Sequence, residues 1–444
     1  MKPKTVTILI VILCICMVLA ALALIVWNMP KKQPGDVETL QTNSVFSPEP
    51  SAVEPDREQA YEGELPAAAQ AAPEAPQEKE PAASSAVQST QLAEQILNSM
   101  TPEEKLWQLF FVAPEALTGE EAVLESSDAL TQALAEKPVG GVILFARNIE
   151  TREQTVSLLA DIRSSSRFTP FLGVDEEGGT VSRVGKNSAM SVKHLQDMSL
   201  YGASGDVSAL YGDLYELAQS LGALGFNVDF APVADVTTGS DENPMKLRSF
   251  SSDPERCASM VAVSVGALQD GGVAACLKHF PGYGTATADD HNGAVSLDRT
   301  LEQLEQTEFV PFSAGIDKGA YFVMVSHLSV PAVTGDDTPA DLSEKLVTEL
   351  LRNTLHFQNV VITDAQNMGS IAQNYTAAEA AVAALRAGVD MILMPQDLQA
   401  AYDGVRKAIS DGVLTENRID RSVLRILNVK IQLGLLTDVP QSAA

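Results

Sequence analysis

Eight short apolar segments alternate with helical segments along the chain, and this alternation limits the possible folds more than any other feature. The segments are QLFFV (108–112), GVILF (141–145), PFLGV (170–174), FNVDFAPV (226–233), VAACL (273–277), YFVMVS (321–326), NVVIT (359–363) and VDMILM (389–394). Uninterrupted apolar runs of this length are typical of strands that are buried on both faces of a parallel sheet. The segments between them, such as AAEAAVAALRAG, have the apolar spacing of helices.

Eight strand–helix units are the number found in a (β/α)8 barrel of the TIM type. We therefore expect an α/β fold in which a barrel domain occupies residues 91–444. A doubly wound open sheet is the alternative, because the periodicity of apolar residues reports burial and does not distinguish a closed sheet from an open one.

Residues 1–32 differ in composition from the rest of the chain. Residues 6–27 form an uncharged apolar run, and a helix of about 20 such residues spans the hydrocarbon core of a bilayer. We expect a single-pass transmembrane helix in the cell membrane, with the C-terminal part of the chain outside the cytoplasm. The alternative is a signal peptide cleaved from a secreted protein, although the run is longer than the apolar core of such peptides and ends without a small-residue cleavage site.

Residues 33–90 have the composition of a disordered linker. They contain eight prolines, and eleven acidic residues against Arg57 and Lys79. A segment with this charge and few large apolar side chains cannot bury a core and stays extended in solvent. We expect it to hold the folded domain away from the membrane.

The net charge of the chain excludes one class of partner. The sequence has 58 acidic residues against 30 lysines and arginines, which gives a formal charge of −28. A protein that binds DNA or RNA needs a basic surface to neutralise phosphates, so we expect no nucleic-acid partner. Cys257 and Cys276 stand among apolar residues and are predicted to be buried thiols rather than a disulfide or part of a zinc site.

Polar residues follow five of the predicted strands. Arg147 and Asn148 follow GVILF, Asp175 and Glu176 follow PFLGV, Lys278 and His279 follow VAACL, His327 follows VMVS, and Asp364 follows NVVIT. In a barrel the carboxyl ends of the strands meet on one face. Enzymes with this fold have their catalytic residues on that face. The pattern therefore predicts a site on this face. Loops are polar in most proteins, and for Arg147 or His327 alone that simpler explanation is equally good.

The segment KHFPGYGTATADDHNG (278–293) places two proton-transfer groups in one loop. Asp289 and His291 stand two residues apart, a spacing that lets the carboxylate orient one ring nitrogen and leaves the other for proton transfer. A metal site made of His279, Asp289, Asp290 and His291 is the competing interpretation, but the segment lacks the HExxH and CxxC spacings of metal motifs.

Asp364, in VVITDAQNMG, stands at the predicted mouth of the barrel. At this position an aspartate could be a nucleophile, a hydrogen-bond acceptor for the substrate, or the N-cap of the helix that follows. The residues around it leave these three roles open.

Blocks along most of the chain resemble glycoside hydrolase family 3, and within it the β-N-acetylglucosaminidase branch. The blocks are MTPEEKLWQLF, VGGVILFARN, GVDEEGGTVSR, NVDFAPVADV, NPMKLRSFSSD, LKHFPGYG with ADDH, VMVSHLSVPAV, VVITDAQNMG, ALRAGVDMILMP and RIDRSVLRILNVKIQLGLL. They occur in the family's order between about Leu97 and Leu436. The resemblance implies a TIM-type barrel and a retaining glycosidase that needs no metal and no organic cofactor.

The resemblance also implies which residues are catalytic. Asp364 corresponds to the family's nucleophile, His291 to its acid/base catalyst and Asp289 to the partner of that histidine. A histidine, with an unperturbed pKa near 6.5, suits proton donation at neutral pH with less adjustment than a carboxyl group needs. In many two-domain relatives the acid/base catalyst comes from a second domain, whereas this chain is expected to take its proton donor from the barrel.

Five further residues are implied to bind the sugar. They are Asp175, Arg183, Arg248, Lys278 and His279. Carboxylates accept hydrogen bonds from pyranose hydroxyls, and arginine or lysine side chains donate to them. The alternative for Arg248 is that it pairs with Asp175 and only shapes the pocket.

Three positions depart from the family's pattern. Tyr283 stands where the KHFPGxG block commonly has His, Thr180 stands where Arg is common after EGG, and Gln366 is atypical beside the nucleophile. These changes bear on substrate range and efficiency, because the predicted catalytic residues are all present.

We therefore expect an exo-acting β-N-acetylglucosaminidase, active as a monomer in peptidoglycan turnover. Its substrate would be terminal β-linked GlcNAc on cell-wall fragments such as muropeptides, or on related glycans. The alternatives are a β-glucosidase or β-xylosidase of the same family, and a wall-binding barrel without activity. Phosphate could also replace water as the acceptor, because a neutral base does not repel an anion.

Overall fold

The structure is a computed structural model that describes residues 82–237, 243–284, 286 and 293–441. Its main sheet has eight strands, which pair in the order β10-β1-β2-β3-β6-β7-β8-β9. The strands are β1 (Phe110–Val112), β2 (Gly141–Ile143), β3 (Phe171–Val174), β6 (Val228–Asp229), β7 (Ala274–Phe280), β8 (Phe322–Val325), β9 (Val360–Thr363) and β10 (Ile392–Leu393). Each of the predicted apolar segments contains or overlaps one of these strands.

The sheet closes into a barrel. Its neighbouring strands pair in parallel, and a parallel bridge between Ile362 of β9 and Met391, beside β10, joins the two ends of the strand order. The backbone N–H of Met391 also donates to the carbonyl of Val361 over 3.0 Å. The predicted (β/α)8 barrel is therefore confirmed, and the open doubly wound sheet is wrong.

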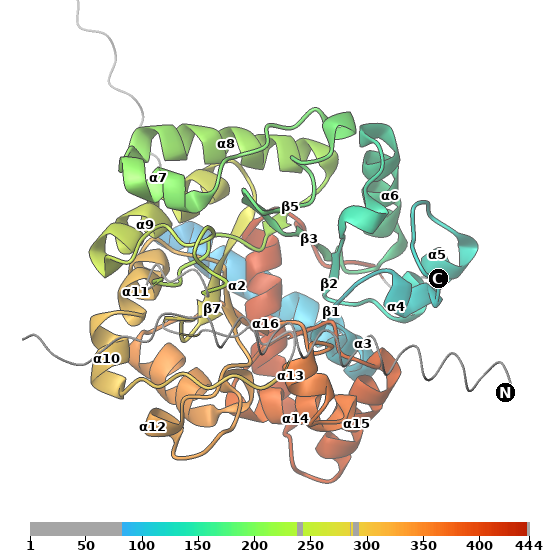
Figure 1. Ribbon diagram of the computed structural model, residues 1–444. Helices are drawn as coiled ribbons and strands as arrows, with labels where there is room; N and C mark the ends of the chain where they lie inside the picture. Colours follow the sequence, from blue (N-terminus) through green and yellow to red (C-terminus); the bar gives the residue numbers. More distant parts are fainter. Residues whose placement is uncertain (1–81, 238–242, 285, 287–292, 442–444) are drawn as a thin grey trace, which may run out of the picture. The chain divides into compact units, whose positions relative to one another are not determined.

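Helices follow the strands and cover the outside of the sheet (Figure 1). The longer ones are α2 (Ala82–Ser99), α5 (Asp128–Glu136), α6 (Arg152–Ser165), α8 (Val207–Leu224), α9 (Pro254–Asp270), α11 (Phe309–Asp317), the π-helix η5 (Lys345–Thr354), α14 (Ala377–Ala387), α15 (Leu398–Ser410) and α16 (Glu416–Gln432). Their limits follow from the sequence. The Thr376 side chain accepts from the backbone N–H of Glu379 at the start of α14, and Gly388 ends this helix in the left-handed conformation.

Short elements complete the connections. They are α3 (Pro102–Trp107), α4 (Glu115–Thr118), η1 (Ala146–Asn148), η2 (Ser188–Met190), α7 (Met198–Ser204), α10 (Leu301–Gln306), α12 (Pro331–Thr334), η4 (Ala340–Leu342) and α13 (Gly369–Ala372). A two-stranded antiparallel hairpin, β4 (Glu176–Gly178) with β5 (Val181–Ser182), projects from the carboxyl end of β3. The sequence patterns did not predict this hairpin, and it contributes directly to the site described below.

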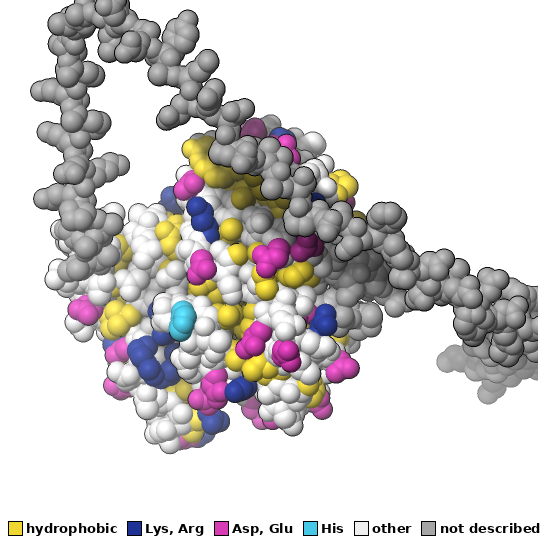
Figure 2. All heavy atoms as spheres, turned by 90° about the vertical axis from the view of Figure 1, so that its left-hand side faces the viewer, with side chains coloured by type: hydrophobic (Ala, Val, Ile, Leu, Met, Phe, Trp, Pro, Cys, Tyr) yellow, Lys and Arg dark blue, Asp and Glu magenta, His cyan; other side chains and the backbone are white. Residues whose placement is uncertain are grey.

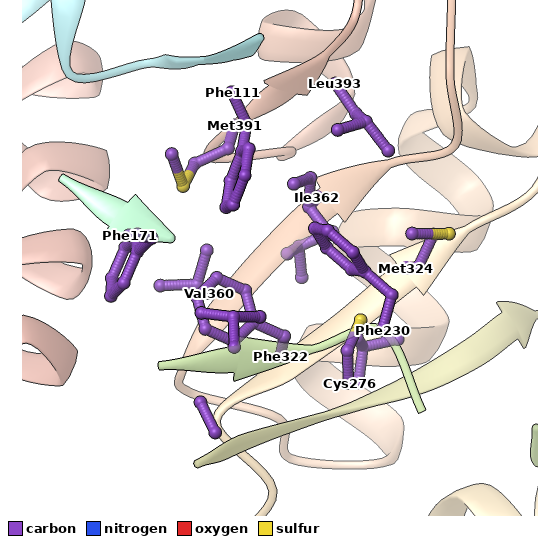
Figure 3. Packing of buried hydrophobic residues seen from close by; sticks show 14 of the residues in the cluster. Phe111, Phe171, Phe230, Cys276, Phe322, Met324, Val360, Ile362, Met391 and Leu393 are labelled. Carbon is purple, nitrogen blue, oxygen red and sulfur yellow. The ribbon is translucent and has the colours of Figure 1, made fainter. Parts of the chain in front are cut away.

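Aromatic side chains fill the interior of the barrel (Figure 3). Phe111, Phe171, Phe230 and Phe322 are fully buried. The rings of Phe111 and Phe230 meet edge to face with centroids 5.2 Å apart, an arrangement that aromatic pairs favour. A Cβ atom on Gly173 would come within 2.8 Å of both rings. A glycine at this strand position therefore makes room for the aromatic pair.

The structure moves one predicted boundary. Helix α2 begins at Ala82, so residues 82–90, predicted to be the end of the disordered linker, are helical. The reason is that α2 packs against α16 and fully buries Ala93 and Ile96, and this packing stabilises the whole helix. The rest of the predicted linker and the apolar run at 6–27 lie outside the described residues. Within the part of the chain that is described, no helix is both long and apolar enough to cross a membrane.

Cys257 in α9 and Cys276 in β7 are buried free thiols. The prediction that they are buried thiols rather than a disulfide is confirmed for this pair. Burial raises the pKa of both thiols, so both are protonated at neutral pH and neither is a reactive nucleophile.

A lysine is buried at the amino end of the barrel. Lys430 of α16 is fully buried, its Nζ donates to Oε1 of Gln108 over 2.7 Å, and the same atom lies 5.2 Å from the ring centroid of Phe171. Neither contact supplies an anion. Burial lowers the pKa of Lys430 to about 7, because an apolar environment disfavours the charged form.

We predict that Lys430 makes folding stability depend on pH. Between pH 7 and 10 the unfolded chain keeps this proton while the folded chain has lost it, so stability rises with pH. The free energy of unfolding of the wild type minus that of Lys430→Met should rise by about 1.4 kcal/mol per pH unit in this window. Chemical denaturation of both proteins at a series of pH values measures this difference in the free energy of unfolding. The exposed control Lys407→Met should show no such slope, and a flat difference for Lys430→Met would contradict the assignment.

Candidate active site

A pocket of about 250 Å³ opens at the carboxyl ends of the barrel strands. Its lining includes every described residue to which the family resemblance assigns a catalytic or sugar-binding role, namely Asp175, Arg183, Arg248, Lys278, His279 and Asp364. Asp175, Lys278, His279 and Asp364 stand at the carboxyl ends of β3, β7 and β9, which meet on one face of a barrel, and loops bring Arg183 and Arg248 to the same place. The roles assigned to them are not tested by this grouping and stay predictions.

Two acids and two bases form a buried ion network on one side of the pocket. Nζ of Lys278 lies 2.9 Å from Oδ1 of Asp175 and 2.6 Å from Oε1 of Glu177. Arg248 donates from Nε and Nη2 to the two carboxylate oxygens of Glu177, over 2.8 and 2.7 Å. This two-point geometry is the strongest that arginine makes with a carboxylate. The expected alternative pairing of Arg248 with Asp175 is wrong, because Glu177 takes that place.

Glu177 lines the pocket, and the sequence patterns missed it. Its side chain is 2% exposed, and the fields of Arg248 and Lys278 hold its pKa far below the ordinary range against the opposing effect of burial. The same pairing raises the pKa of Lys278 although burial opposes it. All three groups are therefore charged at neutral pH. Buried charged groups stay ionised only when nearby opposite charges offset the loss of hydration.

The β4–β5 hairpin directs Glu177 and Arg183 into the pocket. Glu176, its first residue, turns the other way, and its carboxylate accepts from the backbone N–H groups of Arg183 and Val184, each over 2.7 Å. Gly179 has φ +50°, and a Cβ there would lie 1.9 Å from Oδ1 of Asp197. The hairpin thus explains the EGG sequence as a tight turn that only glycine fits.

His279 has a defined orientation. Its Nδ1 lies 2.8 Å from Oδ2 of Asp235, and its backbone N–H donates to Oδ1 of the same carboxylate. Since a carboxylate accepts, the proton is on Nδ1, and Nε2 is left to face Nη2 of Arg248 at 3.4 Å and the pocket. Asp235 was not among the predicted residues, and it fixes the position of one that was.

Asp364 follows β9 at the floor of the pocket. Its backbone N–H donates to the carbonyl of Val325, and its Oδ1 accepts from the N–H of Ala365 over 2.7 Å. Burial would raise the pKa of this carboxyl, but its electrostatic interactions with His279 and His327 outweigh the effect of burial and lower the pKa. Asp364 is therefore an anion at neutral pH, as a carboxylate nucleophile must be.

His327 supports Asp364 from outside the pocket. Its Nε2 lies 3.0 Å from the carbonyl oxygen of Ala365, to which it must donate, and its Nδ1 lies 3.1 Å from Oδ1 of Asp341. Gln366, one of the atypical positions, donates to the other oxygen of Asp341 over 3.4 Å. These buried groups hold the segment after Asp364 in place.

Two of the residues that follow predicted strands have structural roles instead. Arg147 and the buried Asn148 both donate to the carboxylate of Glu115, and neither lines the pocket. The polar character of this loop is explained by that contact.

The other two atypical positions differ in their relation to the pocket. Thr180 is exposed at the tip of the hairpin, outside the pocket lining. Tyr283 is buried and lines the pocket, with its ring edge to face against His279 at a centroid distance of 5.5 Å. Only the change at Tyr283 alters the surface that a ligand would meet.

Asp289 and His291, the predicted acid/base pair, lie outside the described residues, as does Asp290. The described residues on either side end at Gly284, Ala286 and Gly293. Both assignments therefore stay predictions.

Comparison with known proteins identifies the family. Residues 101–429 match the model of the glycosyl hydrolase family 3 N-terminal domain, and the chain belongs to this family. Beta-hexosaminidase A of Pseudoalteromonas piscicida is 30% identical over 346 residues, which cover 71% of this chain and 56% of that protein. Beta-hexosaminidase LpqI of Mycobacterium tuberculosis is 31% identical over 339 residues, covering 74% and 83%.

Solved structures agree with this assignment. A glycoside hydrolase family 3 β-N-acetylglucosaminidase from Paenibacillus sp. str. FPU-7 superposes with a TM-score of 0.70 at 33% identity, covering 78% of this chain and 65% of that one. The structure of LpqI from M. tuberculosis gives a TM-score of 0.67 at 29% identity, covering 75% and 95%. The chain thus spans little more than half of the Pseudoalteromonas enzyme and nearly the whole of the solved LpqI chain.

We predict that removing the charge of Glu177 destabilises the fold. Glu177→Gln leaves Arg248 and Lys278 with one carboxylate fewer, and breaking a buried pair from one side costs about 3–5 kcal/mol. Denaturation at neutral pH measures the loss. Because the pKa of Glu177 is depressed by folding, the difference should shrink as pH falls below about 4. The exposed control Glu153→Gln should change stability by less than about 0.5 kcal/mol; an equally small effect of Glu177→Gln would contradict the network.

Proposed function

We propose that the protein is a retaining exo-β-N-acetylglucosaminidase. The observation that carries the proposal is the ionised Asp364 on the floor of a pocket that already holds oriented donors and acceptors for sugar hydroxyls. The names of the relatives, hexosaminidases and β-N-acetylglucosaminidases, support GlcNAc as the sugar. A pocket at the end of the barrel suits the terminal residue of a glycan.

The mechanism proceeds in two steps. Asp364 attacks the anomeric carbon while His291, oriented by Asp289, protonates the leaving oxygen, and a covalent glycosyl-enzyme forms. The same histidine then removes a proton from water, which attacks the anomeric carbon and releases the sugar with its configuration retained. Asp364 leaves again as a carboxylate, the state that its surroundings favour.

The pocket lining offers both polar groups and apolar surface to a pyranose. Asp175, Arg183, Arg248 and Lys278 present charged donors and acceptors to hydroxyl groups. The apolar lining includes Met245, Met324, Met368 and Met394. Methionine side chains are flexible and polarizable, so they can pack against the C–H faces of the ring or against the acetamido methyl group.

The natural substrate and the location of the enzyme are part of the proposal. The uncharged run at 6–27 supports a membrane anchor, and the Pro-rich acidic segment after it supports a tether that leads to a barrel outside the cytoplasm. An exo-enzyme held there would remove GlcNAc from cell-wall fragments such as muropeptides. A secreted form after cleavage of the N-terminal segment is the alternative.

Three competing activities have direct tests. Hydrolysis rates on aryl β-GlcNAc and aryl β-glucoside or β-xyloside distinguish the proposal from other activities of the family. Wild-type protein that binds muropeptides without turning over any of them would be a wall-binding barrel. Release of sugar 1-phosphate in phosphate buffer would show that phosphate replaces water.

We predict that Asp364→Asn abolishes turnover. An amide cannot attack the anomeric carbon, so kcat on an aryl β-GlcNAc should fall by about 10³-fold or more. The control Asp403→Asn, on the exposed surface of α15, should keep wild-type kcat. A fluorosugar that forms a slowly hydrolysed adduct, followed by peptide mapping, should label Asp364. A label on another residue would contradict the mechanism.

The role of His291 predicts a dependence on the leaving group. A general acid contributes about 10²–10⁴-fold when the leaving group needs a proton, so His291→Ala should lose that factor on a natural disaccharide. Dinitrophenolate leaves without protonation, and its glycoside should be affected far less. The matched change Asp289→Asn should shift the pH profile of kcat/KM in the same assay. Equal losses on both substrates would show that His291 is not the acid.

A further inference from the structure

A second pocket, of about 300 Å³, is lined by five arginines. They are Arg352, Arg386, Arg418, Arg421 and Arg425. The remaining lining includes the neutral donors Thr348, Asn353 and Gln358, and one acid, Glu344. This concentration of one charge stands out in a chain of net charge −28. On the face shown in Figure 2, acidic and basic side chains are mixed over most of the surface, and one group of basic side chains lies beside the histidine at the lower left.

The pocket lies at the end of the barrel opposite to Asp364. Arg352, in η5, donates to the carbonyl of Asn359 just before β9 begins, whereas Asp364 follows the last residue of that strand. Three of the other arginines stand at positions 418, 421 and 425 of α16, and this i, i+3, i+7 spacing places them on one face of the helix. The barrel itself therefore separates this pocket from the proposed active site.

Three of the arginines share one buried carboxylate. Arg352 and Arg425 both donate to Asp390, the latter over 3.1 Å, and Nη1 of Arg418 lies 4.0 Å from the same group. Asp390 also accepts from the hydroxyl of Ser422 and from the backbone N–H of Val361. The single negative charge of Asp390 thus faces the positive charges of three arginines. The carboxylate oxygens of Asp390 already accept several hydrogen bonds.

The arginines repel one another. Burial, together with the fields of Arg425 and Arg418, lowers the pKa of Arg352 to about 10 against the opposing effect of Asp390. Burial lowers the pKa of Arg418 in the same way, with Arg425 and Arg421 contributing. Positive charge in this pocket is therefore in excess of what the carboxylate compensates, and a bound anion would relieve the repulsion.

Two of the arginines are not needed to hold Asp390. Arg386, in the last turn of α14, and Arg421 are exposed, and neither side chain makes an ion pair or a hydrogen bond with another described residue. If the cluster served only to compensate a buried aspartate, Arg352, Arg418 and Arg425 would be sufficient. Arg386 and Arg421 instead add two guanidinium groups to a surface that already repels cations.

We propose that this pocket binds a phosphate group. Guanidinium groups match the oxygens of phosphate in two-point hydrogen bonds, and several of them around one cavity form the usual site for a multiply charged oxyanion. The neutral donors in the lining add hydrogen bonds to the same ligand. The phosphate belongs either to a small phosphate ester or to a repeating phosphodiester polymer, and Arg386 and Arg421 are the residues that bind it.

Thermal unfolding of the full-length protein tests the site. Inorganic phosphate, added at constant ionic strength in place of chloride, should raise the Tm saturably by about 2 °C or more. The double variant Arg386→Gln/Arg421→Gln should lose this rise. Both positions are exposed, so the variant should fold, and its far-ultraviolet circular dichroism checks this. The charge-matched control Arg406→Gln/Lys407→Gln, on the exposed face of α15, should keep it.

The source of the phosphate is distinguished by titration calorimetry. Glycerol 3-phosphate and a poly(glycerol phosphate) are compared at equal phosphate concentration. A polymer ligand should saturate the site at a concentration at least about tenfold lower, because neighbouring phosphates rebind, and a small-ester ligand should show no such gain. The proposal is overturned if neither compound binds, if phosphate stabilises no more than chloride, or if the double variant responds like the wild type. The last two outcomes show that phosphate does not act through Arg386 and Arg421.

Discussion

The buried ion network around Glu177 is the interaction on which the proposed site depends. Arg248 and Lys278 could not both be buried at the pocket without an anion between them, since an uncompensated buried charge costs several kcal/mol. Glu177 supplies that anion through both of its oxygens. The two cations are thereby fixed before any ligand arrives, and their remaining donors keep one orientation. A site whose groups are already oriented loses less entropy when it binds substrate.

The barrel and one hairpin produce this arrangement together. The parallel strands deliver Asp175, Lys278 and Asp364 to one face because their carboxyl ends meet there. Glu177 belongs to no barrel strand, and it reaches the network only because the β4–β5 hairpin folds back over the pocket. The carboxylate of Glu176 ties that hairpin together through backbone N–H groups. Two adjacent glutamates therefore have different tasks, one in folding the loop and one in the site.

The sequence predicted the strands well because buried strands are apolar runs, and it predicted the strand-end residues because polar side chains interrupt those runs. It could not decide that the sheet closes, since closure depends on the contact of Ile362 with Met391 rather than on burial. Glu177 was missed because three acids stand side by side at 175–177 and only the hairpin determines which of them faces the pocket. Asp235 was missed for a similar reason: its contact with His279 joins residues 44 positions apart.

The positive side chains at the two ends of the barrel differ in how far nearby carboxylates balance their charge. This difference supports a different kind of ligand at each end. At the carboxyl end, Lys278 and Arg248 are matched by Asp175 and Glu177, so the pocket offers oriented hydrogen bonds with little net charge and suits a neutral sugar. At the amino end, Asp390 cannot compensate the arginines around it. A neutral ligand would leave that repulsion in place, whereas an anion removes it. Under the two proposals, the two pockets therefore select ligands of different charge.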